Sequence, residues 1–405
     1  MKDYLSIHKQ YSLPMAVLTW AWLFLCHYFS SVSYGVVMKN QTILMISNMY
    51  PSADHPQYGI FIKNISDGLK KNNIKIEMIT MTKKGSAIDK IMSYLGFYLL
   101  VINKIMTKRY AGIYVHYLSH CGAPVLFASL FKKIDIISNA HGGDLVQEDK
   151  VSNRKFFLKK KVNQLLLDKS RLVVAPSQYY KSDVIVRQYG VMQEKVFVSP
   201  SGGVDEKVFK ASDVEMGSKG QPSLLYVGRI TEDKGVFDFL SALEKIKDKN
   251  CVVDIIGHGE KHMLERLKRN MKAFEDSNVT INYHGSVRHD ALPRFYQQAN
   301  AFVFPSKRFS ESLGLVGLEA MACGTPVIGS DIAGISSYLE DGYNGLAFNP
   351  HQPGELKKAL EEFLELEAKD QKNLSVNALL TAQKYSSEKV LSELAYKIKE
   401  ELSLS

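Results

Sequence analysis

Two glutamates stand eight positions apart in the stretch Glu311-Ser-Leu-Gly-Leu-Val-Gly-Leu-Glu319, with two glycines and four branched apolar residues between them. Two carboxylates can form an acid and base pair, or each can accept hydrogen bonds from the hydroxyls of a polyol. On a helix that rises about 1.5 Å per residue, eight residues span about 12 Å, which is too far for a paired acid and base. We therefore expect the two acids to have separate roles.

The stretch between the two acids predicts a binding site for an anion. It reads as a loop followed by a helix that begins near Ser312 or Leu313 and ends at Gly324. The first turn of such a helix, here Leu313, Gly314, Leu315 and Val316, offers backbone N–H groups to phosphate oxygens, and Gly314 lets a ligand approach the backbone. A nucleotide sugar has the matching layout of sugar, diphosphate and ribose. The alternative is an ordinary amphipathic helix with two surface acids.

Two cations follow another predicted strand, in the loop Gly228-Arg-Ile-Thr-Glu-Asp-Lys-Gly235. Arg229 and Lys234 lie five positions apart around a turn, so a guanidinium and an ammonium could converge on one diphosphate. The alternative is a solvated loop with two surface cations. No Asp-x-Asp pair occurs in the sequence, so we do not expect a metal ion to hold the diphosphate.

Length and composition indicate a folded protein of two domains. The chain has 405 residues, of which 45% are hydrophobic and 23% charged, and its formal charge is +9. The cations are interleaved with acids and no nucleic-acid motif appears, so an anionic small molecule or a membrane surface is expected rather than nucleic acid. The cysteines Cys26, Cys121, Cys251 and Cys323 are isolated, which predicts a reducing compartment and no zinc site.

Short apolar runs alternate with amphipathic stretches, which is typical of parallel sheets covered by helices. Ligands of such sheets bind outside the carboxyl ends of the strands, so two halves that face each other predict a site in the cleft between them. A polar linker is expected at Gly203–Gln221, and Ser386–Leu404 reads as an amphipathic helix that could pack back across the domains. The strands expected are Thr42–Ser47, Ile74–Thr80, Gly112–Leu118, Asp135–Ala140, Leu172–Ala175, Val196–Ser199, Leu224–Gly228, Val252–Gly257, Val279–Tyr283, Ala301–Phe304, Pro326–Gly329 and Leu346–Phe348.

The N-terminal residues 1–37 form an apolar extension. Leu13–Phe29 is nearly all apolar and is marginal in length for a membrane span. Three interpretations remain open: a membrane anchor, a cleaved signal, or an upstream segment that is not part of the native product. Met38 and the polar residues after it run directly into the first predicted strand, as at a natural chain start.

Several motifs together resemble the retaining glycosyltransferases of family 4, the glycosyl transferases group 1, which have the GT-B fold. The stretch from Glu311 to Glu319 is similar to their E-x7-E motif, and Gly228–Gly235 to their Gly-Arg-x5-Lys-Gly loop. Pro200–Asp205 (PSGGVD) resembles their inter-domain Pro-Asn-Gly-Val-Asp, with Ser-Gly in place of Asn. The resemblance implies two Rossmann-like doubly wound α/β domains that face a central cleft, with a C-terminal helix packed back across them. The ranges expected are 1–37 for the extension, 38–205 for the acceptor domain, 206–385 for the donor domain and 386–405 for the C-terminal helix.

The resemblance also implies roles for single residues. Glu319 would bind the ribose hydroxyls and Glu311 the hydroxyls of the transferred sugar. His141, in Asn139-Ala-His-Gly-Gly-Asp144, corresponds to a histidine near that sugar. Gly59 lies in a stretch similar to a loop of the family that often contains two adjacent glycines. In this chain Gly59 is followed by Ile60. The residues expected to act in catalysis are Glu311, His141, Lys234 and Arg229, and those expected to bind the donor are Gly59, Arg229, Lys234, Glu311, Leu313, Gly314, Leu315, Val316 and Glu319.

The activity implied is the transfer of a hexosyl group from a nucleotide diphosphate sugar to a hydroxyl of a glycan or lipid-linked acceptor. The resemblance implies retention of anomeric configuration, and neither a metal nor another cofactor is expected, since no Asp-x-Asp pair occurs. The possible N-terminal anchor and the apolar and cationic stretches described next indicate a role in cell-surface polysaccharide or lipopolysaccharide biosynthesis. A related sugar phosphorylase, a nucleotide-sugar epimerase and a non-catalytic nucleotide-sugar-binding protein remain alternatives. The stretches Ile88–Lys108 and Lys155–Lys161 mix apolar residues with cations, which indicates either contact with an anionic membrane or core helices with a basic face. We expect a cytoplasmic protein that can associate with the inner face of the cell membrane.

Overall fold

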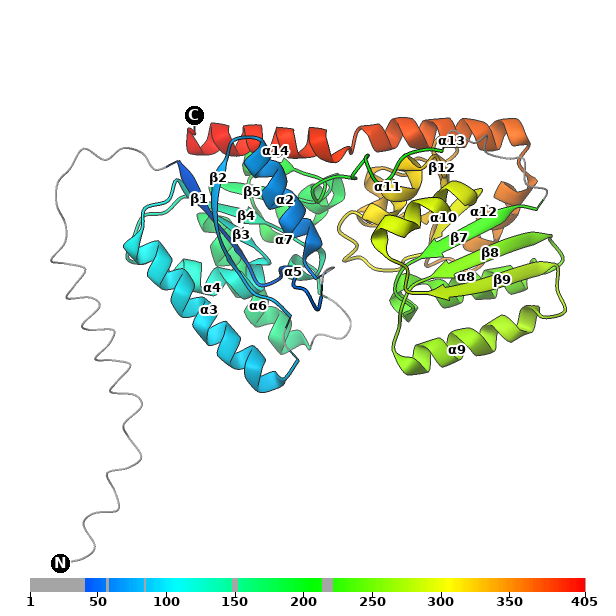
Figure 1. Ribbon diagram of the computed structural model, residues 1–405, viewed down its shortest axis with the longest axis horizontal. Helices are drawn as coiled ribbons and strands as arrows, with labels where there is room; N and C mark the ends of the chain where they lie inside the picture. The colour runs from blue at the N-terminus through cyan, green and yellow to red at the C-terminus, as the bar shows by residue number, and fades with distance from the viewer. Residues whose placement is uncertain (1–40, 56–57, 84, 148–151, 213–220, 405) are drawn as a thin grey trace, which may run out of the picture.

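The computed structural model describes residues 41–404 except 56–57, 84, 148–151 and 213–220. The predicted extension 1–37 lies outside the described residues, as does much of the linker predicted at 203–221. The chain forms two parallel six-stranded sheets, each with helices on both faces (Figure 1). This arrangement confirms the predicted α/β architecture of two doubly wound halves.

The first sheet has the strand order β2-β1-β3-β4-β5-β6. Its strands are β1 (Thr42–Ser47), β2 (Lys75–Thr80), β3 (Gly112–His116), β4 (Ile136–Asn139), β5 (Leu172–Ala175) and β6 (Val196–Val198). The central strands are buried along their whole length, because helices cover both faces of the sheet. One face carries α2 (Ile60–Lys71) and α14 (Ser387–Leu402), and the other carries α3 (Ala87–Thr107), α4 (Leu118–Ala128) and α6 (Asn153–Lys169).

The second sheet has the strand order β12-β11-β10-β7-β8-β9. Its strands are β7 (Ser223–Val227), β8 (Cys251–Ile256), β9 (Val279–Gly285), β10 (Ala301–Phe304), β11 (Val327–Ser330) and β12 (Gly345–Phe348). Helices α8 (Val236–Glu244), α9 (Lys261–Met271) and α12 (Glu355–Glu365) pack on one face, and α10 (Leu292–Gln298), α11 (Leu315–Ala322) and α13 (Ala368–Gln383) pack on the other.

Shorter helical segments occupy the loops. Those used below are α5 (Gly142–Leu145), which follows β4, and the 3-10 turns η3 (Glu232–Lys234) after β7 and η5 (His289–Ala291) after β9. A π-helical segment, η1 (Tyr180–Val186), runs into α7 (Arg187–Tyr189). Three further 3-10 turns are η2 (Gln193–Lys195), η4 (Lys272–Phe274) and η6 (Ile335–Ser337).

A residue with a positive φ angle makes each of two predicted boundaries wrong. The strand expected to reach Leu118 ends at His116, since Tyr117 has φ 56° and α4 begins directly after it. His120 therefore lies on α4. The helix expected to begin near Ser312 or Leu313 begins at Leu315, because Gly314 has φ 81° and cannot belong to a right-handed helix.

The chain crosses between the two halves twice, and the two crossings are bonded to each other. The Val204 N–H donates to the Tyr385 carbonyl, and the Ser387 N–H donates to the Val204 carbonyl, both at 2.8 Å. The predicted linker is therefore partly fixed, and Phe209 within it is buried in the second half. Beyond this crossing, α14 returns to the first half, where Leu394 packs with the residues of α2, as expected for the C-terminal helix (Figure 1). None of the helices in the described part of the chain is long and apolar enough to cross a membrane.

Candidate active site

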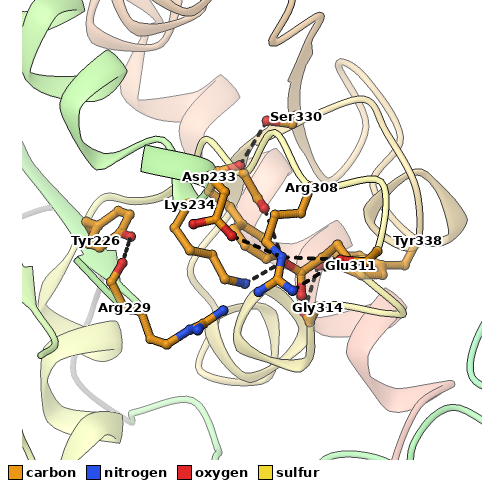
Figure 2. Close-up of polar contacts among 12 residues, drawn as sticks. Tyr226, Arg229, Asp233, Lys234, Arg308, Glu311, Gly314, Ser330 and Tyr338 are labelled. Carbon is orange, nitrogen blue, oxygen red and sulfur yellow. Dashed lines mark hydrogen bonds and ion pairs between the residues drawn. The ribbon is translucent and has the colours of Figure 1, made fainter. Parts of the chain in front are cut away.

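An ion pair between Lys234 and Glu311 is the centre of the candidate site (Figure 2). Lys234 lies at the end of η3, and Glu311 lies in the loop between β10 and α11. The Lys234 Nζ is 2.5 Å from the Glu311 Oε2, and the two side chains are only 15% and 14% exposed. Burial raises the pKa of Glu311, but Lys234, Arg308 and the Ser306 hydroxyl outweigh burial and hold that pKa below its usual value. Glu311 is therefore an ionised acceptor.

Two arginines add positive charge around this pair. Arg229 is exposed and extends its side chain toward Lys234 and Glu311 (Figure 2). Arg308, which the sequence analysis did not single out, has its Nε 3.3 Å from an Asp233 carboxylate oxygen. Three cations thus surround two carboxylates, which leaves one surplus positive charge for an anionic ligand.

The turn before α11 is shaped by Gly314. Its φ of 81° requires glycine, and a Cβ at this position would lie 2.6 Å from the Phe304 ring. The Tyr338 hydroxyl donates a 2.9 Å hydrogen bond to the Gly314 carbonyl and fixes the turn. The half-buried Leu315 and Val316 form the first turn of α11, whose N–H groups can bind an anion.

Leu313 is not part of that first turn, contrary to the expectation. It precedes the helix and its side chain is buried in the apolar core of the second half. The expected set of helical N–H donors therefore begins at Leu315.

Glu319 is buried on α11 and has partners of its own. The His289 Nε2, from η5, is 3.0 Å from the Glu319 Oε1, and the Tyr296 hydroxyl donates to Oε2 at 3.5 Å. The hydrogen bond to Glu319 raises the pKa of His289. Glu311 and Glu319 thus have different partners, which agrees with separate roles for the two acids.

Gly59 lies in the first half, where it precedes α2. Its φ is 73°, and a Cβ at this position would lie 2.7 Å from the Met49 carbonyl carbon. The loop after β1 is therefore tightly folded at this glycine, at the carboxyl edge of the first sheet.

His141 is buried at the carboxyl end of β4 and begins α5. Its Nε2 is 3.2 Å from the Nδ1 of His116, and its ring stacks on Tyr117. Burial lowers the pKa of His141 to about 3, so the imidazole is neutral. The Asp144 carboxylate accepts a hydrogen bond from the His141 N–H and holds the loop. Among the described residues, the buried Nε2 of His116 has no hydrogen-bond partner.

The two halves meet beside these residues. A Cβ at Gly142 would lie 2.3 Å from the Ser310 carbonyl oxygen, so the loop after β4 contacts the loop that carries Glu311. The Tyr179 N–H also donates to the Ser337 hydroxyl across the boundary, at 3.3 Å. Loops at the carboxyl edges of both sheets therefore come together at the candidate site.

The comparisons with known proteins agree with this geometry. Residues 209–380 match the family Glycosyl transferases group 1. A D-inositol 3-phosphate glycosyltransferase of Paenarthrobacter aurescens (strain TC1) is 26% identical over 332 residues, which cover 77% of this chain and 76% of the relative. An uncharacterized glycosyltransferase of Methanocaldococcus jannaschii is 27% identical, over 89% of this chain and 94% of the relative.

Solved structures show the same fold. Sucrose-phosphate synthase from Thermosynechococcus elongatus superposes with a TM-score of 0.73 at 18% identity, over 90% of this chain and 100% of that chain. HepE of Anabaena, solved in complex with UDP and glucose, has a TM-score of 0.67 at 18% identity, over 89% of this chain and 100% of that chain. The match over residues 209–380 shows that the second half resembles the glycosyl transferases group 1, and the two facing sheets have the GT-B fold of these solved structures.

Proposed function

We propose that this glycosyltransferase moves a hexosyl group from a nucleoside diphosphate sugar to a hydroxyl of a glycan or lipid-linked acceptor, with retention of anomeric configuration. The observation that carries the proposal is the largely buried Lys234 and Glu311 pair beside the N-terminus of α11, with the buried Glu319 farther along the same helix. A nucleoside diphosphate sugar has a diphosphate between a sugar and a ribose. A group of cations between two acids that can accept hydrogen bonds from hydroxyls fits this layout.

The residues of the second half would bind the donor and stabilise its leaving group. Negative charge grows on the diphosphate as the bond between the anomeric carbon and the phosphate oxygen breaks. Lys234, Arg229 and the first turn of α11 would stabilise that charge from positions fixed before the reaction. Glu311 would accept hydrogen bonds from the sugar and Glu319 from the ribose. These cations take the place of a metal ion, so we propose that the reaction needs neither metal nor cofactor.

The acceptor oxygen would form its bond on the face from which the diphosphate leaves. A phosphate oxygen of the leaving group would take the acceptor's proton, so no protein nucleophile is required. The neutral His141 and its loop would lie near the transferred sugar, because this loop contacts the loop of Glu311 through Gly142. Closure of the two halves would exclude water and limit hydrolysis of the donor.

The names of similar proteins support this substrate class and its setting. HepE was solved with UDP and glucose, and a lipopolysaccharide outer core galactosyltransferase superposes with a TM-score of 0.64 at 15% identity. A protein encoded in a cps region of Klebsiella pneumoniae is 27% identical over 272 residues. We propose a role in cell-surface polysaccharide or lipopolysaccharide biosynthesis, in the cytoplasm at the inner face of the membrane.

A donor panel tests the proposal. The full chain is incubated with several nucleoside diphosphate sugars and lipid-linked acceptors, with and without EDTA, and the products are identified by mass spectrometry and NMR. We expect one donor to be consumed with release of the nucleoside diphosphate, EDTA to have little effect, and the product to keep the donor's anomeric configuration. Release that requires inorganic phosphate would identify a phosphorylase instead. Conversion of the sugar without transfer would identify an epimerase, and binding without consumption a non-catalytic protein.

A further inference from the structure

The first half exposes an apolar face on its layer of α3, α4 and α6. Of the eighteen large hydrophobic side chains that are exposed in the described part of the chain, twelve lie on these helices or the turn after α4. They are between 45% and 74% exposed. The twelve, here called the apolar face, are Ile88, Ile91, Met92, Leu95, Leu99, Leu100, Phe127, Leu130, Phe131, Phe157, Leu158 and Leu165.

Helix α3 is apolar on two opposite sides. Phe97, Val101 and Ile105 are buried against the sheet and α4. A second stripe, from Ile88 to Leu99, recurs at helical spacing and is exposed. A surface helix packs on the core with one apolar stripe, and its other side is usually polar. The second, exposed apolar stripe of α3 therefore indicates a further apolar partner.

The three helices form one layer on the first sheet. All three bury their inner sides against the same face of the first sheet, and α4 packs between α3 and α6. The sides of these helices that are remote from the sheet therefore belong to one surface of the first half. The N-terminal ends of α3 and α6 lie at the carboxyl edge of the sheet, the edge at which the two halves meet.

Cations are interleaved with this face. The segment 154–161 of α6 contains five cations and no acid. Lys155, Lys160 and Lys161 are exposed, and the Lys161 Nζ lies 4.8 Å from the centre of the Phe157 ring. None of these three lysines forms an ion pair with an acid of the described part of the chain. An apolar surface with exposed cations beside it matches the interface of an anionic bilayer, in which acyl chains lie beneath anionic headgroups.

We infer that the apolar face, with Lys155, Lys160 and Lys161, docks onto the anionic surface of a lipid bilayer. A bilayer on this face places the membrane beside the carboxyl edge of the first sheet, where a lipid-linked acceptor could reach the site without leaving the membrane. The choice of acceptor rests on the proposed function, whereas docking itself does not.

A fluorescent reporter on the apolar face tests the docking. Leu95 on α3 is 54% exposed, and Tyr396 on α14, at the opposite side of the first half, is 72% exposed (Figure 1). Leu95→Cys and Tyr396→Cys, each in the full chain with Cys26→Ser, are labelled with an environment-sensitive dye; Cys121, Cys251 and Cys323 are buried. On addition of vesicles of phosphatidylcholine with phosphatidylglycerol, the dye at position 95 should brighten and shift to the blue, while the dye at position 396 should not change.

A charge variant tests the cations. Lys155→Glu/Lys160→Glu/Lys161→Glu should weaken the vesicle response of the dye at position 95 by about tenfold or more, since each cation near an anionic surface contributes to binding. The matched control Lys369→Glu/Lys372→Glu/Lys389→Glu, on exposed positions of α13 and α14, changes the net charge equally and should leave the response unchanged.

Three results would overturn the inference. One is a dye at position 95 that does not respond to anionic vesicles, whatever residues 1–37 do at the bilayer. Another is equal weakening by the two triple variants. The third is a dye signal that grows with protein concentration in the absence of lipid, which would make the apolar face an interface between two copies of the chain. The vesicles contain no donor or acceptor, so failure of docking and failure of the proposed transfer are measured separately.

Discussion

The Lys234 and Glu311 pair is expected to serve both stability and catalysis, and two substitutions can separate these contributions. Lys234→Met keeps most of the side-chain volume and leaves the Glu311 carboxylate, at 14% exposure, without its ammonium partner. Removing one member of a buried ion pair costs about 3 to 5 kcal/mol. The Ser306 hydroxyl still donates a hydrogen bond to this carboxylate at 3.1 Å. We therefore expect the free energy of unfolding to fall by about 3 kcal/mol, the lower end of that range.

The second substitution removes the carboxylate charge that Lys234→Met leaves without a partner. Glu311→Gln in the Lys234→Met chain replaces the buried carboxylate with a neutral amide, so the double variant should regain about 2 of the 3 kcal/mol. Its activity should not return, because the cation that would face the diphosphate is still absent. Loss of one such charge-stabilising group lowers the turnover of an enzyme by about 10² to 10³.

Both quantities can be measured on the same preparations. Urea unfolding followed by circular dichroism reports stability, and mass spectrometry of donor turnover reports activity. Lys249→Met is the control, because its partner Glu365 is 64% exposed and such pairs contribute little; neither measurement should change. A double variant as unstable as Lys234→Met would show that the unpaired carboxylate is not the cause of the loss. Full turnover in Lys234→Met would refute the role of this lysine in the site.

Three further predictions follow from the geometry. Gly142→Ala should lower turnover without lowering the melting temperature of either half, because its Cβ would collide with Ser310 across the boundary between the halves. The control Gly96→Ala places a Cβ where no atom lies within 4 Å and should leave turnover unchanged. Equal turnover in the two variants would contradict the contact. Gly314→Ala should lower the free energy of unfolding by at least about 1 kcal/mol, because the left-handed conformation is unfavourable for alanine, and urea unfolding checks this. The raised pKa of His289 means that its pairing with Glu319 stabilises the fold fully below pH 6.5 and progressively less as the pH rises through the raised value. The melting temperatures of wild type and His289→Gln should therefore differ most near pH 6 and least near pH 9; a difference that grows with pH would refute the assignment.

The alternation of short apolar runs with amphipathic stretches was sufficient to predict the fold. Runs such as Leu-Val-Val-Ala at 172–175 are too short for buried helices, and this one is bounded by Arg171 and Pro176, so its assignment as a strand was secure. The two boundary errors described above occurred where one residue has a positive φ angle. Gly314 could have signalled a turn but stands within an apolar run, and Tyr117 gives no sign in the sequence of its positive φ.

The sequence could predict the site residues that lie in recognisable loops, but not the contacts between side chains that are far apart along the chain. Glu311 and Lys234 each lie in a recognisable loop, and neighbouring parallel strands bring those two loops to one edge of the sheet. Arg308 lies three residues before Glu311, so a cation so close to a candidate acid was a usable signal. The pairing of His289 with Glu319 depends on side chains meeting from separate elements, and no local pattern encodes such a meeting.

The two sides of the site differ in charge, and this difference favours a division of tasks between the halves. In the second half, Lys234, Arg229 and Arg308 surround ionised carboxylates at the turn that leads into α11. In the first half, burial lowers the pKa values of His116 and His141, so both imidazoles are neutral. A diphosphate is held best by the charged side, whereas the neutral imidazole of His141 could contact sugar hydroxyls without attracting the leaving diphosphate. Charge stabilisation would therefore come from the second half, and the first half would position the sugar and the acceptor.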